Sequence, residues 1–144
     1  MVTEDEVSRV VAEVSAGAED PRHVSALVGA FMQDQPLVGH YVSSHGKELT
    51  LEGVVLTLLH ASVVARCIET HAGRDLRAVK PAELDAAARR NDIDEASLTK
   101  SEPALMSYIM SNIPPEDATL NGARRSEALK LLFVLTRAFL EQVS

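Results

Sequence analysis

The feature of this sequence that most constrains its fold is an apolar run near the middle of the chain. Between residues 53 and 65 no side chain carries a formal charge at neutral pH. The apolar residues of this run are interrupted only by Thr57, His60 and Ser62. Such a run is longer than an ordinary strand and is typical of a helix buried on nearly all sides. We therefore predict a central helix over about residues 50–72, with Thr50 as its N-cap and Gly73 at its end.

Capping residues and periodic apolar residues predict further helices on both sides of the central one. Thr3 and Glu6 form the capping box of a first helix. Its apolar face repeats at helical spacing through Val7, Val10, Val11 and Val14. Prolines near the first helical position predict further helices, and these prolines are Pro21, Pro36, Pro81 and Pro103. Residues 91–101 are predicted as either a short surface helix or a loop, and a last helix begins between residues 117 and 122.

Composition agrees with a helical fold. Only 3% of the residues are aromatic, and strands with sustained alternation of apolar and polar residues are nearly absent. A chain of 144 residues can bury a core without disulfides or structural metal. We predict one all-α domain over residues 1–144, a single compact bundle of six to seven helices. The central helix is expected to pack on the long C-terminal helix.

The charge of the chain makes several functional classes less favourable. A formal net charge of −7 repels phosphate backbones and anionic lipid surfaces, so we expect neither nucleic-acid nor membrane binding.

The uncharged run is shorter than a transmembrane helix requires. The acidic N-terminal segment does not resemble a signal peptide, and the single cysteine, Cys67, fits a reducing compartment. A cytoplasmic location is therefore expected.

Three chemically reactive side chains of the predicted central helix share one face. At about 100° per residue, His60, Cys67 and His71 form a stripe along this helix. Cys67 and His71 are one turn apart and could bind one Zn²⁺ or a similar ion. His40 and His45, from the preceding short helix, could supply further nitrogen ligands. The stripe is therefore the candidate site for a ligand or a metal.

The same stripe also has a purely structural interpretation, which the sequence favours. Cysteine often fills a core as a small apolar residue, an inward histidine can bond a carbonyl, and His71 complements the helix dipole. Nucleophilic catalysis by Cys67 would need an exposed thiol beside a base. No metal, dinucleotide, phosphate-binding or nucleophile-elbow motif is present. We therefore predict no catalytic residue, no metal and no cofactor, and the sequence leans against an enzyme.

The C-terminal helix is apolar well beyond one stripe. Its apolar residues are Leu131, Leu132, Phe133, Leu135 and Phe139. Such a helix either belongs to the core or covers a partner. The leading hypothesis is therefore a non-catalytic protein-interaction or self-associating domain that uses this helix. The alternative is a small-ligand or metal-binding protein with a pocket lined by His60, Cys67 and His71.

Overall fold

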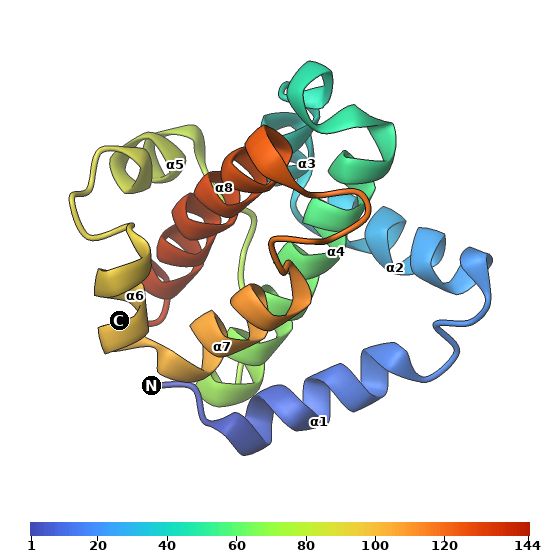
Figure 1. The fold of residues 1–144 in the computed structure, drawn as a ribbon. Coiled ribbons are helices and arrows are strands. Elements are labelled where there is room, and N and C mark those ends of the chain that lie inside the picture. The colour runs from blue at the N-terminus through green and yellow to red at the C-terminus, as the bar shows by residue number, and fades with distance from the viewer.

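The computed structural model describes residues 1–144 and contains helices only (Figure 1). Its eight helices, in chain order, are α1 (Glu4–Ser15), α2 (Pro21–Asp34), α3 (Pro36–Ser43), α4 (Gly46–Ala72), α5 (Pro81–Ala88), α6 (Glu95–Ser101), α7 (Pro103–Asn112) and α8 (Gly122–Glu141). The all-α prediction is confirmed. Eight helices are one more than the upper end of the predicted six to seven, and the ambiguous segment 91–101 contains helix α6. The side chain of its N-cap residue, Asp94, accepts a hydrogen bond from Ser97 N at 2.7 Å.

The central helix begins with a sharp change of direction at Thr50. This residue interrupts α4 with φ +68° and ψ +165°, a backbone conformation that residues other than glycine rarely adopt. Its hydroxyl oxygen accepts a hydrogen bond from Gly53 N at 3.2 Å. Thr50 therefore caps the long part of α4, as predicted, and residues 46–49 form a short turn of helix before it. The helix ends at Gly73, which has φ +70°.

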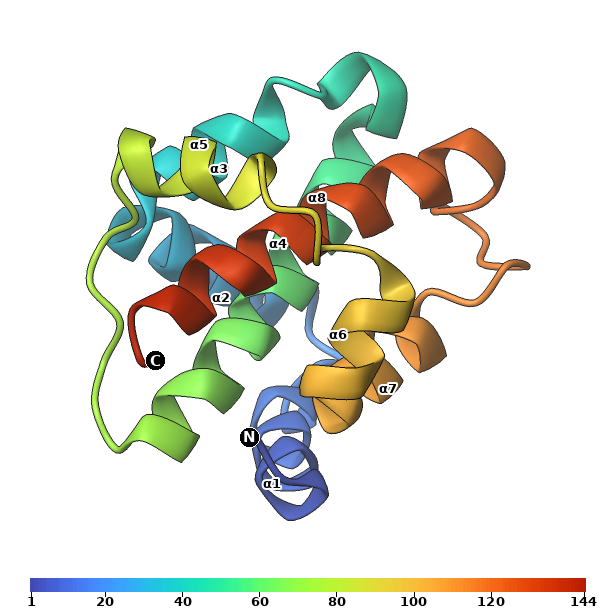
Figure 2. The ribbon, with the colours of Figure 1, turned by 90° about the vertical axis from the view of Figure 1, so that its left-hand side faces the viewer.

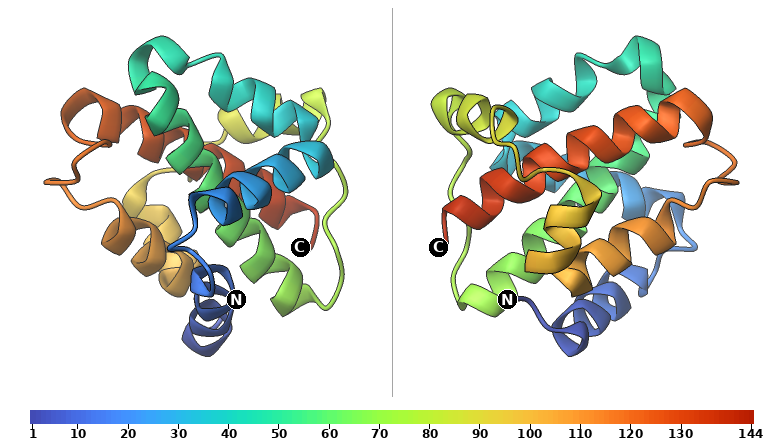
Figure 3. Two further views of the ribbon diagram at one scale, coloured as in Figure 1. Left: turned by 90° about the vertical axis from the view of Figure 1, so that its right-hand side faces the viewer. Right: turned by 60° about the vertical axis from the view of Figure 1, so that its left-hand side comes forward.

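Helix α4 lies between two layers of helices. Helix α8 runs along one side of α4, while α1 and α2 lie on the other (Figures 2 and 3). Helix α3 packs beside the first part of α4, α5 packs on α8, and α7 joins α1, α4 and α6. This arrangement explains the uncharged run, because a helix with neighbours on both sides has little surface left for charged side chains.

Most of the apolar face of α8 is used inside the chain. Leu131, Leu132, Leu135 and Phe139 are each at most 2% exposed, and Phe133 is half-buried. The ring of Phe139 meets that of Phe31 from α2 edge to face, with centroids 6.4 Å apart. The surplus of apolar residues that suggested a partner surface therefore covers α4 and closes the core.

The complete helix α4 is longer than the uncharged run within it. Helix α4 has 27 residues, and by length and composition alone it could span a membrane. Buried core helices have the same properties, and 61% of the most apolar 18-residue window of α4 is buried among the other helices.

Candidate functional site

The five predicted site residues do not lie together. His60 faces α7, where its Nδ1 atom is 2.9 Å from the hydroxyl oxygen of Tyr108. The two rings meet edge to face, with centroids 5.8 Å apart. Cys67 lies in the core and is 0% exposed. His60 and Cys67 share a helix face, as predicted, but have different surroundings.

Burial makes the Cys67 thiol unreactive. It raises the pKa of Cys67 to about 12, and the negative charge of Glu6 acts in the same direction. A thiol with this pKa is almost entirely protonated near neutral pH, whereas nucleophiles and metal ligands use the thiolate. The position therefore suits a small apolar residue of the core.

The remaining three histidines of the predicted site, His40, His45 and His71, lie apart from one another. His71 Nδ1 is 2.9 Å from a carboxylate oxygen of Glu6, and this contact joins the end of α4 to α1. His45 precedes α4, with Nδ1 2.9 Å from the carbonyl oxygen of Tyr41. His40 is exposed. No three His, Cys, Asp or Glu side chains are grouped so that they could hold a metal ion.

His60 lines a hollow between four helices. We call this hollow, of about 150 Å³, the His60 cavity. Its walls come from α1, α2, α4, α7 and the connection between α1 and α2, and are formed by Val11, Val14, Ser15, Ala18, Val24, Leu27, Leu59, His60, Val63, Tyr108 and Asn112. No Asp, Glu, Lys or Arg is among them. His60 is therefore a wall residue of a cavity rather than a fully packed core residue.

The cavity exists because α1 and α2 rest on α4 rather than on each other. Both helices pack against the same side of α4 (Figure 3). The gap that remains between them is lined by short aliphatic side chains, mainly valines of α1 and α2. Valine has a rigid and compact side chain, so it closes the gap incompletely and leaves space above His60.

The polar pair in this cavity is uncharged near neutral pH. Burial lowers the pKa of His60 to about 4, although the carboxylate of Asp117 opposes the shift. Burial also raises the pKa of the Tyr108 hydroxyl. A neutral imidazole and a neutral phenol therefore meet at the wall of an otherwise mainly apolar space. The second ring nitrogen of His60, Nε2, has no hydrogen-bond partner in the protein.

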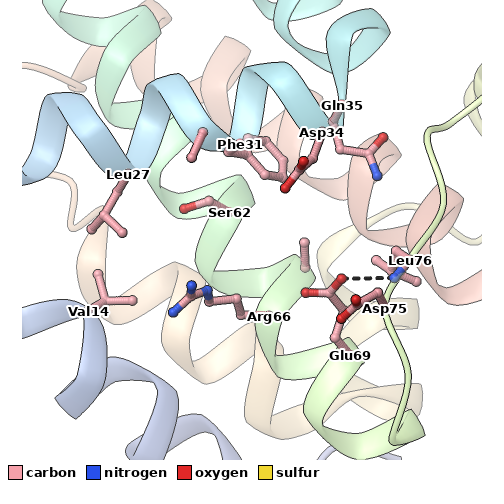
Figure 4. A pocket seen from close by; sticks show the side chains of 12 residues that line it. Val14, Leu27, Phe31, Asp34, Gln35, Ser62, Arg66, Glu69, Asp75 and Leu76 are labelled. Carbon is pink, nitrogen blue, oxygen red and sulfur yellow. Dashed lines mark hydrogen bonds between the residues drawn. The ribbon is translucent and has the colours of Figure 1, made fainter.

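A second hollow lies on the other side of Val14 and Leu27. We call it the Arg66 groove, and its volume is about 390 Å³. It runs between α1, α2, α4 and the segment after α4 (Figure 4). Val14 and Leu27 line both hollows, so these two side chains divide the groove from the cavity. Arg66 extends toward the apolar end of the groove, beside Ser62 and Val14 (Figure 4).

The far end of the Arg66 groove is acidic. Glu69 and Asp75 lie together there, and Asp34 extends toward them from α2 (Figure 4). Glu69 accepts a hydrogen bond from Leu76 N at 2.8 Å, which fixes the segment after α4. Burial raises the pKa of Glu69, and the charge of Asp75 adds to the effect. The side of α4 that carries Ser62, Arg66 and Glu69 therefore lines a groove.

The sequence did not identify Tyr108 as part of the site. Its position was hidden in the periodic apolar face of α7, where Leu105 and Ile109 are fully buried. The sequence feature that could have pointed to Tyr108 is its hydroxyl, because a tyrosine on a buried helix face needs a hydrogen-bond partner. Only two tyrosines occur in the chain, but the partner lies 48 residues away, and single-helix periodicity does not reveal such pairs.

The fold and the site define an all-helical bundle with a small, mainly apolar cavity beside its central helix. Comparisons with protein-family models, with curated proteins and with solved structures gave no match. The function is therefore argued from the geometry of the chain itself.

Proposed function

We propose that this protein is a non-catalytic binding protein that holds a small, largely apolar molecule in the His60 cavity. The observation that carries this proposal is a cavity of about 150 Å³ into which a buried helix places one imidazole. An apolar cavity of about 150 Å³ is large enough to bind benzene.

The walls of the cavity fit this role. Apolar side chains supply burial, and a few polar groups fix the orientation of a ligand, which is the usual composition of small-molecule sites. Ser15, Ala18 and Val24 belong to the α1–α2 part of the wall, where the side chains are partly or fully exposed. A ligand can therefore reach the cavity between α1 and α2 without opening the packing of α4 on α8.

The competing hypothesis of self-association has less support from the molecule. It rested on apolar residues of α8, and four of these are in the core. The large apolar side chains that stay exposed are Met1, Met32 and Leu51, and scattered exposed apolar residues are ordinary. Self-association remains a prediction, which the mass of the native particle tests.

A titration followed by NMR tests the proposal. Toluene added to the ¹⁵N-labelled protein should shift amide signals around the cavity in α1, α2, α4 and α7. Replacing the half-buried Val24 by phenylalanine (Val24→Phe) fills part of the cavity and should weaken binding at least tenfold. Leu37→Phe is the matched control, because Leu37 is a half-buried residue of α3 outside the cavity wall.

Two results would contradict this function. Either toluene causes no saturable shift, or Val24→Phe and Leu37→Phe bind it as the unchanged protein does. Native mass spectrometry of protein taken from its cell extract adds an independent reading, because a retained small molecule appears as extra mass on the folded chain.

A further inference from the structure

The polar atoms of the His60 cavity restrict the chemistry of its ligand, an inference that rests on the binding function proposed above. The hydroxyl of Tyr108 already occupies Nδ1 of His60. The free nitrogen, Nε2, is a donor in one tautomer of the neutral ring and an acceptor in the other. A ligand hydroxyl can both donate and accept, so it pairs with either tautomer without a change in the His60–Tyr108 bond.

The walls also exclude a charged ligand. No Asp, Glu, Lys or Arg lines the cavity, and the raised pKa of Tyr108 keeps its hydroxyl neutral. A carboxylate or an ammonium group placed there would lose part of its hydration and would find no ion-pair partner in the wall, which is unfavourable. The charged residues Arg66 and Glu69 belong to the neighbouring groove, behind Val14 and Leu27.

The size of the cavity sets the third limit. Its volume of about 150 Å³ matches a single six-membered ring. We propose that the ligand of the His60 cavity is an uncharged single-ring molecule with one hydroxyl group, of the phenol class. Its ring packs against the aliphatic side chains of α1 and α2, and its hydroxyl hydrogen-bonds His60 Nε2.

Phenol, toluene and benzoate are suitable probes because they share the ring and differ in one substituent. Dissociation constants are measured at pH 7 with the unchanged protein and with His60→Leu. Toluene lacks the hydroxyl, so the ratio of its dissociation constant to that of phenol reports the hydrogen bond. This ratio should fall about tenfold in His60→Leu, and benzoate should bind at least a hundredfold more weakly than phenol.

A measurement on the unchanged protein does not depend on the folding of a variant. With ¹⁵N-labelled histidine, phenol should shift the Nε2 resonance of His60, whereas toluene should leave it nearly unmoved. An equal ratio in His60→Leu, an Nε2 signal that responds alike to both probes, or benzoate binding as tight as that of phenol overturns the ligand class. If none of the three probes binds, the binding function itself fails.

Discussion

Two residues of α4 are held in conditions that their side chains do not favour, and both can be tested by substitution. Thr50 adopts a positive φ at the start of the long helix, and the His60 ring is enclosed in a mainly apolar wall. The sequence predicted the position of both residues, Thr50 as a cap and His60 facing inward. It did not predict their strain or their environment, because these depend on segments distant along the chain.

Substitution of Thr50 separates backbone strain from capping. A threonine at φ +68° costs about 1–3 kcal/mol, whereas exchanging a threonine cap for glycine costs only a few tenths. Thr50→Gly should therefore raise the free energy of unfolding by about 1 kcal/mol. Thr50→Ala loses the cap and keeps the strain, so it should lower this free energy by about 1 kcal/mol. Urea unfolding measures both, and equal effects of the two variants would contradict the assignment of strain.

The low pKa of His60 makes the stability of the fold depend on pH. Between pH 6.5 and about 4, the unfolded chain binds a proton at His60 and the folded chain does not. The free energy of unfolding should therefore fall as the pH is lowered through this range, by up to about 3 kcal/mol from this residue. Below pH 4 its contribution becomes constant.

Other groups titrate in the same pH range. The contribution of His60 to the pH dependence of stability is therefore obtained by comparing the unchanged protein with a variant that lacks this histidine. Urea unfolding of the unchanged protein and of His60→Gln is compared at pH 7 and pH 4.5. Glutamine does not titrate, so the loss of stability on acidification should be smaller in His60→Gln. Parallel losses in the two proteins would show that His60 is already protonated or solvated in the folded state.

At the scale of elements, the sequence predicted most helices through caps and prolines. Pro21 and Pro81 begin helices as expected, and the Thr3 capping box is present. The segment 91–101 was ambiguous because it has few apolar residues, and a buried one, Leu98, anchors α6 in the core. Helix α8 was predicted as an element, but its partner was left open, since an apolar surface alone does not reveal what covers it.

The role of α8 can be tested with Leu132, which is 0% exposed. Leu132→Ala leaves a cavity in the core and should lower the free energy of unfolding by about 2–5 kcal/mol. Leu51→Ala is the control, because Leu51 is 82% exposed and should change stability by less than about 0.5 kcal/mol. Light scattering after size exclusion reports the particle mass. A Leu132→Ala protein of unchanged stability and reduced mass would instead show that α8 is an interface.

At the scale of the whole molecule, the sequence predicted the central position of α4 but not the hollows around it. A helix without charges must be covered, and α8, α1 and α2 cover it as the pattern implies. The His60 cavity and the Arg66 groove depend on how closely α1 approaches α2, which helical periodicity does not contain. The predicted stripe of His60, Cys67 and His71 is consequently divided among a cavity, the core and a contact with the carboxylate of Glu6.

The His60 cavity also gives the molecule a response to hydrostatic pressure. Unfolding removes internal voids, so the unfolded chain with its solvent occupies less volume, with typical changes of about −20 to −100 mL/mol. Compression should therefore favour unfolding, and a molecule that fills the cavity should oppose it. The chain with its cavity filled should therefore unfold at a higher pressure than the chain alone.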